Sequence, residues 1–370
     1  MNFTIITHVV HGQNENGYYG YGPYIREMNL WLKYVDKVTV VAPLQTVTED
    51  PIYLFYEHND LGFIPVKSFS FTSVKYIVKA FFQLPGNFRK LYRAMKAADH
   101  IHLRCPGNIA LLGCVVQILF PKTPKTAKYA GNWDAKAKQP LSYRMQKWIL
   151  NNTFLTRNMQ VLVYGEWEGS SRNIKPFFTA SYKEIDKHEV AIRKMEGTIR
   201  FLFVGTLSEG KRPMYAVRLV EQLKHLGHSV RLDLYGEGKE RFELTDYIQK
   251  NCLQDLVFLH GNQTAEFVKG AYQNSHFLLL PSKSEGWPKV VAEAMFWSCV
   301  PVASAISCVS NMLDSGSRGV ILSMEIQNDV SQLDSYIWND DKYLKTAEEA
   351  MMWSRKYTLD YFETEIQTLL

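Results

Sequence analysis

The chain has 370 residues, of which 46% are hydrophobic, 13% aromatic and 21% charged. At roughly 150 residues a domain, the length predicts about two domains. The ordinary apolar fraction excludes a disordered chain, a collagen and a coiled coil, and the net charge of +5 is too small to indicate nucleic-acid binding.

The first half of the chain alternates runs of β-branched residues with amphipathic segments, which is typical of βαβ units. A strand is predicted over residues 3–10, then a glycine-rich loop over 11–22 and a helix that begins at Pro23. The pattern weakens through 44–66, and a Leu-Pro-Gly break at 84–86 separates two predicted helices. The remaining predictions are strands at 37–41, 101–104, 127–130 and 160–163, and helices at 73–82, 87–98, 109–120 and 141–151.

A second alternating series follows residues 165–197, which are polar and lack sustained periodicity, so the domain boundary is placed there. Two α/β units, each over a mostly parallel sheet, are the economical architecture. This half is predicted to hold strands at 199–204, 230–235, 256–259, 277–280 and 300–303, and helices at 214–226, 242–251, 264–271 and 289–297.

The five cysteines are odd in number and include no C-x-x-C pair, which disfavours disulfides and a cysteine-based zinc site. His100 and His102 alternate on a predicted strand without a third ligand nearby, so they are predicted to occupy core and edge positions. The opening segment is typical of a strand, and the apolar block 109–120 is too short for a bilayer of about 30 Å. We therefore expect no metal site and a cytoplasmic protein, soluble or at most peripheral.

The most informative segment is LPSKSEGWPKVVAEAM at residues 280–295. A buried strand runs into a loop, and Pro288 is placed to open a helix, so backbone N–H groups face the carboxyl edge of a sheet. Gly286 lets a ligand approach the backbone closely. Because bare phosphate would repel the carboxylates of Glu285 and Glu293, these side chains suit neutral hydroxyls, such as those of a sugar and a ribose.

The segment resembles the E-x7-E motif of glycosyltransferase family 4, retaining enzymes of the bacterial polysaccharide-biosynthesis type. Three further elements resemble the family in the same order, namely VGTLSEGK at 204–211, YGEG at 235–238 and VFLHG at 257–261. The resemblance implies the GT-B fold, with two Rossmann-like α/β/α domains facing an interdomain cleft. It implies an acceptor-binding domain with the linker at 1–190, a nucleotide-sugar-binding domain at 191–355, and a helix at 356–370 that crosses back to the first domain.

The resemblance also implies roles for individual residues. Glu285 would contact the donor sugar, Lys211 would neutralise the diphosphate and leaving-group charge, and Glu293 would bind the ribose hydroxyls. For each of these, a solvated surface side chain is the alternative. Further donor-binding positions are expected at Gly205, Thr206, Arg212, Gly236, Gly286, Trp287 and Pro288, and, from the first domain, at Gly20 and Gly22, for which a plain turn is the alternative.

Some positions depart from the family pattern. Thr206 stands where the family usually has an arginine, so Arg212 is the candidate second cation. Asn132 follows a strand where many members have a histidine, and it is predicted to contact the donor sugar, with a structural turn as the alternative. Cys299 and Cys308 replace glycines, and small buried thiols are the expected reading.

The sequence is therefore interpreted as a retaining glycosyltransferase that moves a sugar from a UDP- or GDP-linked donor to a glycan or lipid-linked acceptor in cell-surface polysaccharide biosynthesis. No D-x-D motif occurs, so an obligatory Mn²⁺ or Mg²⁺ is not expected, and no other cofactor is. The alternatives are a GT-B epimerase or sugar phosphorylase, or a catalytically degenerate nucleotide-sugar-binding partner subunit.

The net charge is divided unevenly along the chain. Residues 1–190 carry 23 Lys+Arg against 14 Asp+Glu, whereas 191–370 carry 19 against 23. Residues 67–98 hold seven basic residues, interleaved with aromatic ones, and no acidic residue, and 121–150 hold seven against one. We expect peripheral contact with an anionic membrane through 67–98, which suits a lipid-linked acceptor. A solvated basic face over a packed aromatic stripe is the alternative.

Overall fold

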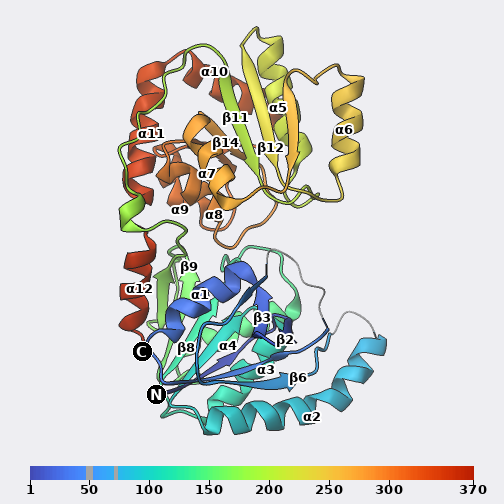
Figure 1. The fold of residues 1–370 in the computed structure, drawn as a ribbon, viewed down its shortest axis with the longest axis vertical. Helices are drawn as coiled ribbons and strands as arrows, with labels where there is room; N and C mark the ends of the chain where they lie inside the picture. Colours follow the sequence, from blue (N-terminus) through green and yellow to red (C-terminus); the bar gives the residue numbers. More distant parts are fainter. Residues whose placement is uncertain (47–52, 71–73) are drawn as a thin grey trace. The chain divides into compact units, whose positions relative to one another are not determined.

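The computed structural model describes residues 1–46, 53–70 and 74–370 (Figure 1). The chain forms two compact units, one of Met1–Phe177 with Glu363–Leu370 and one of Phe178–Phe362. The division at Phe177 lies before the boundary placed at residue 190, because the intervening side chains pack within the second unit. Phe178 stacks on Tyr361 with ring centroids 5.3 Å apart.

The first unit is built on a seven-stranded parallel sheet with the strand order β10-β9-β8-β7-β1-β4-β6. Successive side chains of β1 point to opposite faces. Phe3 stacks against Trp31 of α1, and Ile6 belongs to the apolar core on the other face. The strands are β1 (Asn2–Ile6), β4 (Lys37–Pro43), β6 (Leu61–Val66), β7 (His100–Cys105), β8 (Lys125–Tyr129), β9 (Met159–Tyr164) and β10 (Ile174–Phe177). The helices are α1 (Gly22–Leu32), α2 (Val74–Lys96), α3 (Asn108–Val116), η1 (Gln117–Leu119) and α4 (Leu141–Leu150).

The predicted glycine-rich loop at 11–22 is wrong. This segment forms β2 (His11–Asn14) and β3 (Gly17–Tyr21), which join β5 (Tyr53–Phe55) in a separate antiparallel sheet. Aromatic side chains stabilise it, since Tyr19 packs against Phe55 at 5.4 Å between ring centroids. In the sequence, glycines and asparagines interrupt the alternation of apolar and polar residues that would have indicated these strands.

The predicted break at 84–86 is also wrong, because α2 runs unbroken from Val74 to Lys96 and contains Pro85. A proline removes one hydrogen bond of the helix and bends it, and Figure 1 shows α2 changing direction. The buried side chains of Ala80 and Leu91, on either side of the proline, hold both halves against the unit.

The second unit is built on a six-stranded parallel sheet with the order β13-β12-β11-β14-β15-β16. Its strands are β11 (Ile199–Val204), β12 (Val230–Tyr235), β13 (Val257–Gly261), β14 (Phe277–Leu280), β15 (Val300–Ser304) and β16 (Val320–Leu322). Its helices are η2 (Glu184–Asp186), α5 (Pro213–His225), α6 (Arg241–Lys250), α7 (Ala265–Asn274), α8 (Lys289–Phe296), α9 (Val309–Met312), η3 (Asp314–Gly316), α10 (Ile326–Ile337) and α11 (Asp340–Ser354). The last helix, α12 (Leu359–Gln367), contains the division between the units at Phe362. The strands predicted at 199–204, 230–235 and 277–280 are confirmed.

The strand order brings the motif loops together. Because β11 lies between β12 and β14, the loops that follow these three strands meet at one carboxyl edge, where open α/β sheets bind ligands. Within the part of the chain that the structure describes, no helix has the length and apolarity needed to cross a membrane.

Candidate functional site

Backbone hydrogen bonds join the loops at the carboxyl edge of the second sheet. The Gly205 N–H donates to the Tyr235 carbonyl at 2.9 Å, and the Gly236 N–H donates to the Gly261 carbonyl at 2.8 Å. Gly236 has a φ of +141°, and a Cβ there would overlap the Gly205 carbonyl oxygen. A side chain at position 236 would therefore push the first two loops apart.

An ion pair between Lys211 and Glu285 lies at the centre of this edge. The Lys211 Nζ contacts the Glu285 Oε1, and the side chains are 28% and 12% exposed respectively. A second bond fixes the same two loops, since the Lys283 N–H donates to the Gly210 carbonyl at 2.7 Å. The two residues predicted to act on the diphosphate and the sugar therefore lie side by side, although 74 residues separate them in the sequence.

Arg212 and Thr206 lie on the same loop as Lys211. Arg212 has left-handed backbone angles (φ 53°, ψ 51°) directly before Pro213, which opens α5. Such a conformation is uncommon for a residue with a long side chain. Arg212 is half-buried and Thr206 is exposed, so both side chains are accessible to solvent, and their predicted contacts with a donor stay predictions.

The turn from β14 into α8 is held from behind by residues that follow β15. The Ser307 hydroxyl donates to the Gly286 carbonyl at 2.9 Å, and the Cys308 thiol donates to the same oxygen at 3.3 Å. Burial raises the pKa of Cys308 to about 12, so this thiol stays protonated and can donate. Pro288, the N-cap residue of α8, accepts no hydrogen bond through a side chain, and its carbonyl accepts the Val291 N–H at 2.9 Å.

The Trp287 side chain is used in packing. Its ring lies 6.3 Å from that of Trp353 and 6.2 Å from that of Tyr357. These contacts fix the loop at a residue that the sequence analysis predicts to bind the donor.

Glu293 already binds two hydroxyl groups of the protein. The Ser181 hydroxyl donates to its Oε1 at 2.5 Å, and the buried Tyr272 hydroxyl donates to its Oε2 at 3.0 Å. Burial raises the pKa of Tyr272 well above its ordinary value, so this donor keeps its proton. The carboxylate therefore accepts hydrogen bonds from two protein hydroxyls in this structure, and its predicted contact with ribose stays a prediction.

The predicted residues of the first unit have structural roles there. The Asn132 Oδ1 accepts the Asp134 N–H at 2.8 Å, which is the structural turn named as the alternative. Gly20 lies in β3 opposite His11, and Gly22 is the first residue of α1. Their predicted contacts with a donor stay predictions.

Sequence reasoning missed Ser181, Tyr272 and Ser307. Each acts through a single hydroxyl that reaches a residue 21 or more positions away. No local pattern distinguishes such a serine or tyrosine from others, so no sequence signal could have found them.

Residues 184–352 match the family described as glycosyl transferases group 1. This region of the chain is therefore similar to the members of that family. An uncharacterized glycosyltransferase of Methanocaldococcus jannaschii is 25% identical over 188 residues, which are 50% of this chain and 51% of that protein. The alpha-D-kanosaminyltransferase of Streptomyces kanamyceticus is 25% identical over 121 residues, 33% of this chain and 31% of that protein. The chain thus spans about half or less of the length of the curated relatives it matches.

Solved structures share the fold over the whole chain. Sucrose-phosphate synthase from Thermosynechococcus elongatus superposes with a TM-score of 0.67 at 16% identity, covering 100% of this chain and 98% of that one. The Anabaena protein HepE in complex with UDP gives a TM-score of 0.69 at 13% identity, covering 100% and 99%. These likenesses and the two Rossmann-like units confirm the predicted GT-B fold.

Proposed function

We propose that this protein is a retaining glycosyltransferase that moves a sugar from a UDP- or GDP-linked donor to a hydroxyl of a glycan or lipid-linked saccharide acceptor in cell-surface polysaccharide biosynthesis. The observation that carries the proposal is the ion pair of Lys211 with Glu285, in which Glu285 lies in the loop that leads into α8. The pair brings a cation and a carboxylate together at one sheet edge, within the region that matches the glycosyl transferases group 1.

The chemistry follows from these groups. The bond from the anomeric carbon to the diphosphate breaks, a bond to the acceptor oxygen forms on the same face, and the acceptor proton passes to the leaving diphosphate. An ammonium has three donors, so Lys211 can contact the diphosphate while it keeps Glu285. Lys211, Arg212 and the N–H groups of α8 stabilise the charge that develops on the leaving group.

The two carboxylates have separate tasks. Glu285 orients the donor sugar through its hydroxyls, and Glu293 on α8 binds the ribose hydroxyls. Gly205, Gly236 and Gly286 keep the backbone close to the donor, because no Cβ intervenes. No step needs a metal ion, and we expect full activity in the presence of a chelator.

Similar proteins support the class of substrate. HepE and the pneumococcal GtfA were solved with UDP. A Campylobacter jejuni relative, 24% identical over 146 residues, is an N-acetyl-D-galactosaminyltransferase that acts on an undecaprenol-linked saccharide. UDP-sugars and polyprenol-linked acceptors are therefore the first compounds to test.

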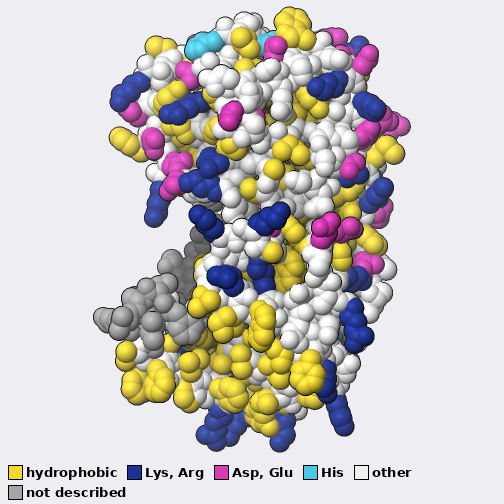
Figure 2. All heavy atoms as spheres, turned by 180° about the vertical axis from the view of Figure 1, so that it is seen from behind, with side chains coloured by type: hydrophobic (Ala, Val, Ile, Leu, Met, Phe, Trp, Pro, Cys, Tyr) yellow, Lys and Arg dark blue, Asp and Glu magenta, His cyan; other side chains and the backbone are white. Residues whose placement is uncertain are grey.

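The surface of the first unit supports a membrane-bound acceptor. Phe81 and Phe82 on α2 are 72% and 78% exposed, and Leu141 and Trp148 on α4 are 70% and 65% exposed. α3 packs against both α2 and α4, so these side chains lie on one helical layer. Figure 2 shows apolar side chains over this unit with Lys and Arg at their edge. Of the predicted segment 67–98, residues 71–73 lie outside the described part.

A donor screen tests the proposal. UDP-, GDP- and ADP-sugars are compared by thermal shift, since a ligand of the folded state raises its stability, and the donor that binds is then incubated with saccharide acceptors. We expect transfer with the donor's anomeric configuration, read by NMR of the product. Epimerisation of the donor alone, a requirement for free phosphate, or binding without transfer would each replace the proposal with one of its alternatives.

A further inference from the structure

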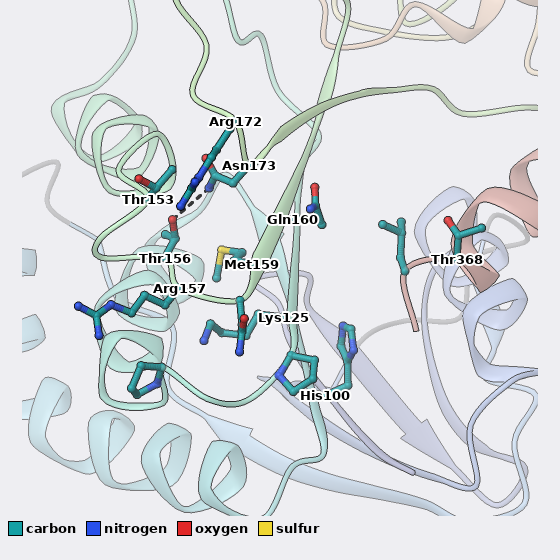
Figure 3. Close-up of a pocket in the computed structure, with 14 residues that line it drawn as sticks. His100, Lys125, Thr153, Thr156, Arg157, Met159, Gln160, Arg172, Asn173 and Thr368 are labelled. Carbon is teal, nitrogen blue, oxygen red and sulfur yellow. Dashed lines mark hydrogen bonds between the residues drawn. The ribbon is translucent and has the colours of Figure 1, made fainter.

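A cavity of about 750 Å³ lies at the amino-terminal edge of the sheet in the first unit (Figure 3). The first residues of three neighbouring strands line it, namely His100 of β7, Lys125 of β8 and Met159 of β9. Its volume is within the range of small-molecule sites. It is at the opposite edge of this sheet from the carboxyl ends of the strands, so it is separate from the usual ligand position of the fold.

The charges around the cavity are of one sign. Lys125, Arg157 and Arg172 line it, and none of the described residues in its lining is acidic. Asp99 directly precedes His100 in the sequence, but its carboxylate is engaged elsewhere, because it accepts the Asn2 N–H at 2.7 Å. Within the described part of the chain, the ion pairs of arginine involve neither Arg157 nor Arg172. Figure 3 shows Arg172 beside Thr156 and Asn173, whereas the Arg157 side chain extends away from them.

Two buried donors also face this region. The side chain of His100 is 1% exposed and its Nδ1 has no hydrogen-bond partner, while its Nε2 lies 3.0 Å from the Thr126 hydroxyl. Burial lowers the pKa of His100 to about 4, so the ring is neutral. The Thr126 Oγ1 also lies 2.9 Å from the His102 Nδ1. In the arrangement where this hydroxyl accepts from His102 and donates to the His100 Nε2, the His100 ring proton is on Nδ1, and a buried donor without an acceptor is costly.

Lys125 is the second buried donor. The residue is 2% exposed. Its ammonium donates to the Phe120 carbonyl at 2.5 Å and to the Thr123 carbonyl at 3.1 Å. These bonds use two of its three hydrogens. Burial lowers the pKa of Lys125 to about 8, and an anion beside it would reverse that effect.

We propose that this cavity is a binding site for a phosphate group, held by the guanidinium groups of Arg157 and Arg172 and by the inner donors on Lys125 and His100. Arginine pairs with phosphate in a bidentate geometry. The phosphate comes either from a lipid headgroup or from a soluble phosphate ester. The first source is consistent with Phe154, a 70% exposed ring that lies 4.6 Å from the Arg157 guanidinium.

The test compares two double variants of equal charge change. Arg157→Gln with Arg172→Gln alters the cavity, and Arg26→Gln with Lys136→Gln removes two exposed charges elsewhere in the unit. Both are made in a Lys211→Ala background, which weakens diphosphate binding in the second unit. Calorimetry with inorganic pyrophosphate and co-sedimentation with phosphatidylglycerol vesicles supply the two probes.

The outcomes separate the sources. A soluble ligand predicts pyrophosphate binding that falls at least about tenfold in the cavity variant alone, because each charged hydrogen bond contributes about tenfold or more. If the ligand is a lipid headgroup, we expect vesicle binding to fall at least about tenfold in the cavity variant and much less in the control variant. Equal affinities of the two variants for both probes, or no binding of either probe by the parent, would overturn the proposal.

Discussion

We expect that removing Lys211 or Glu285 lowers the turnover of the enzyme and leaves the protein folded. The pair lies on two loops rather than in a core, and both members are partly accessible, at 28% and 12%. Lys211→Ala and Glu285→Ala are the informative changes. We expect both variants to fold, because neither leaves an isolated charge deep in an apolar interior.

The expected loss of stability is much smaller than the expected loss of turnover. A partly exposed ion pair contributes about 0–1 kcal/mol to the free energy of unfolding, and the exposure of Lys211 keeps this figure low. By contrast, removing one preorganised group that stabilises transition-state charge costs about 2.7–4 kcal/mol, or roughly 10²–10³ in turnover. Turnover is therefore expected to fall by two to three orders of magnitude while stability changes little.

The chain offers a matched control. Lys283 and Glu209 form another ion pair between the same two loops, with exposures of 43% and 85%. Lys283→Ala is expected to leave turnover within about twofold of the parent. Initial rates with the donor from the screen, together with urea unfolding, measure all three variants.

Two results would refute the reasoning. Near-parental turnover in both Lys211→Ala and Glu285→Ala would remove the pair from the site. An equal loss in Lys283→Ala would show that the loops, rather than the pair, determine activity.

Four further predictions use the same preparations. Glu293→Ala is expected to lower the free energy of unfolding by about 1–3 kcal/mol through its lost hydroxyl bonds and to weaken nucleotide binding, both read by thermal shift. Gly236→Ala should destabilise the protein by about 2 kcal/mol or more in urea unfolding, whereas Gly270→Ala, with open space around its Cβ, should not. Burial lowers the pKa of His276 from 6.5 to about 4, so the unfolded chain takes up a proton first as the pH falls and stability is lost between about pH 6.5 and 4; His276→Gln should make that loss shallower. Phe81→Ser should weaken co-sedimentation with anionic vesicles about tenfold, and no change would contradict the membrane contact.

The second sheet was predictable because its strands are continuous apolar runs between turn residues. Residues 277–280 are four buried apolar residues before a proline, and 199–204 precede a glycine. Segments without such contrast were missed. The hairpin at 11–21 is polar and glycine-rich, and its stability comes from aromatic contacts with residues more than thirty positions away.

The site was predictable where the residues belong to a motif. Lys211 and Glu285 each follow a strand at a fixed distance, and the parallel order of the sheet brings them together. The residues that hold the site residues in place are brought there by the tertiary structure alone. Ser307 holds Gly286 across neighbouring loops, and Ser181 reaches Glu293 from the start of the unit, so neither follows from local sequence.

The hydroxyl groups that already bind Glu293 affect how its contribution to ligand affinity is interpreted. A ribose that displaces Ser181 and Tyr272 exchanges one set of hydroxyl partners for another, instead of meeting a carboxylate surrounded only by water. The number of hydrogen bonds on the carboxylate stays the same in such an exchange. Selectivity for a nucleotide at this residue is then the difference between two sets of hydroxyl partners, and any measured contribution of Glu293 reports that difference.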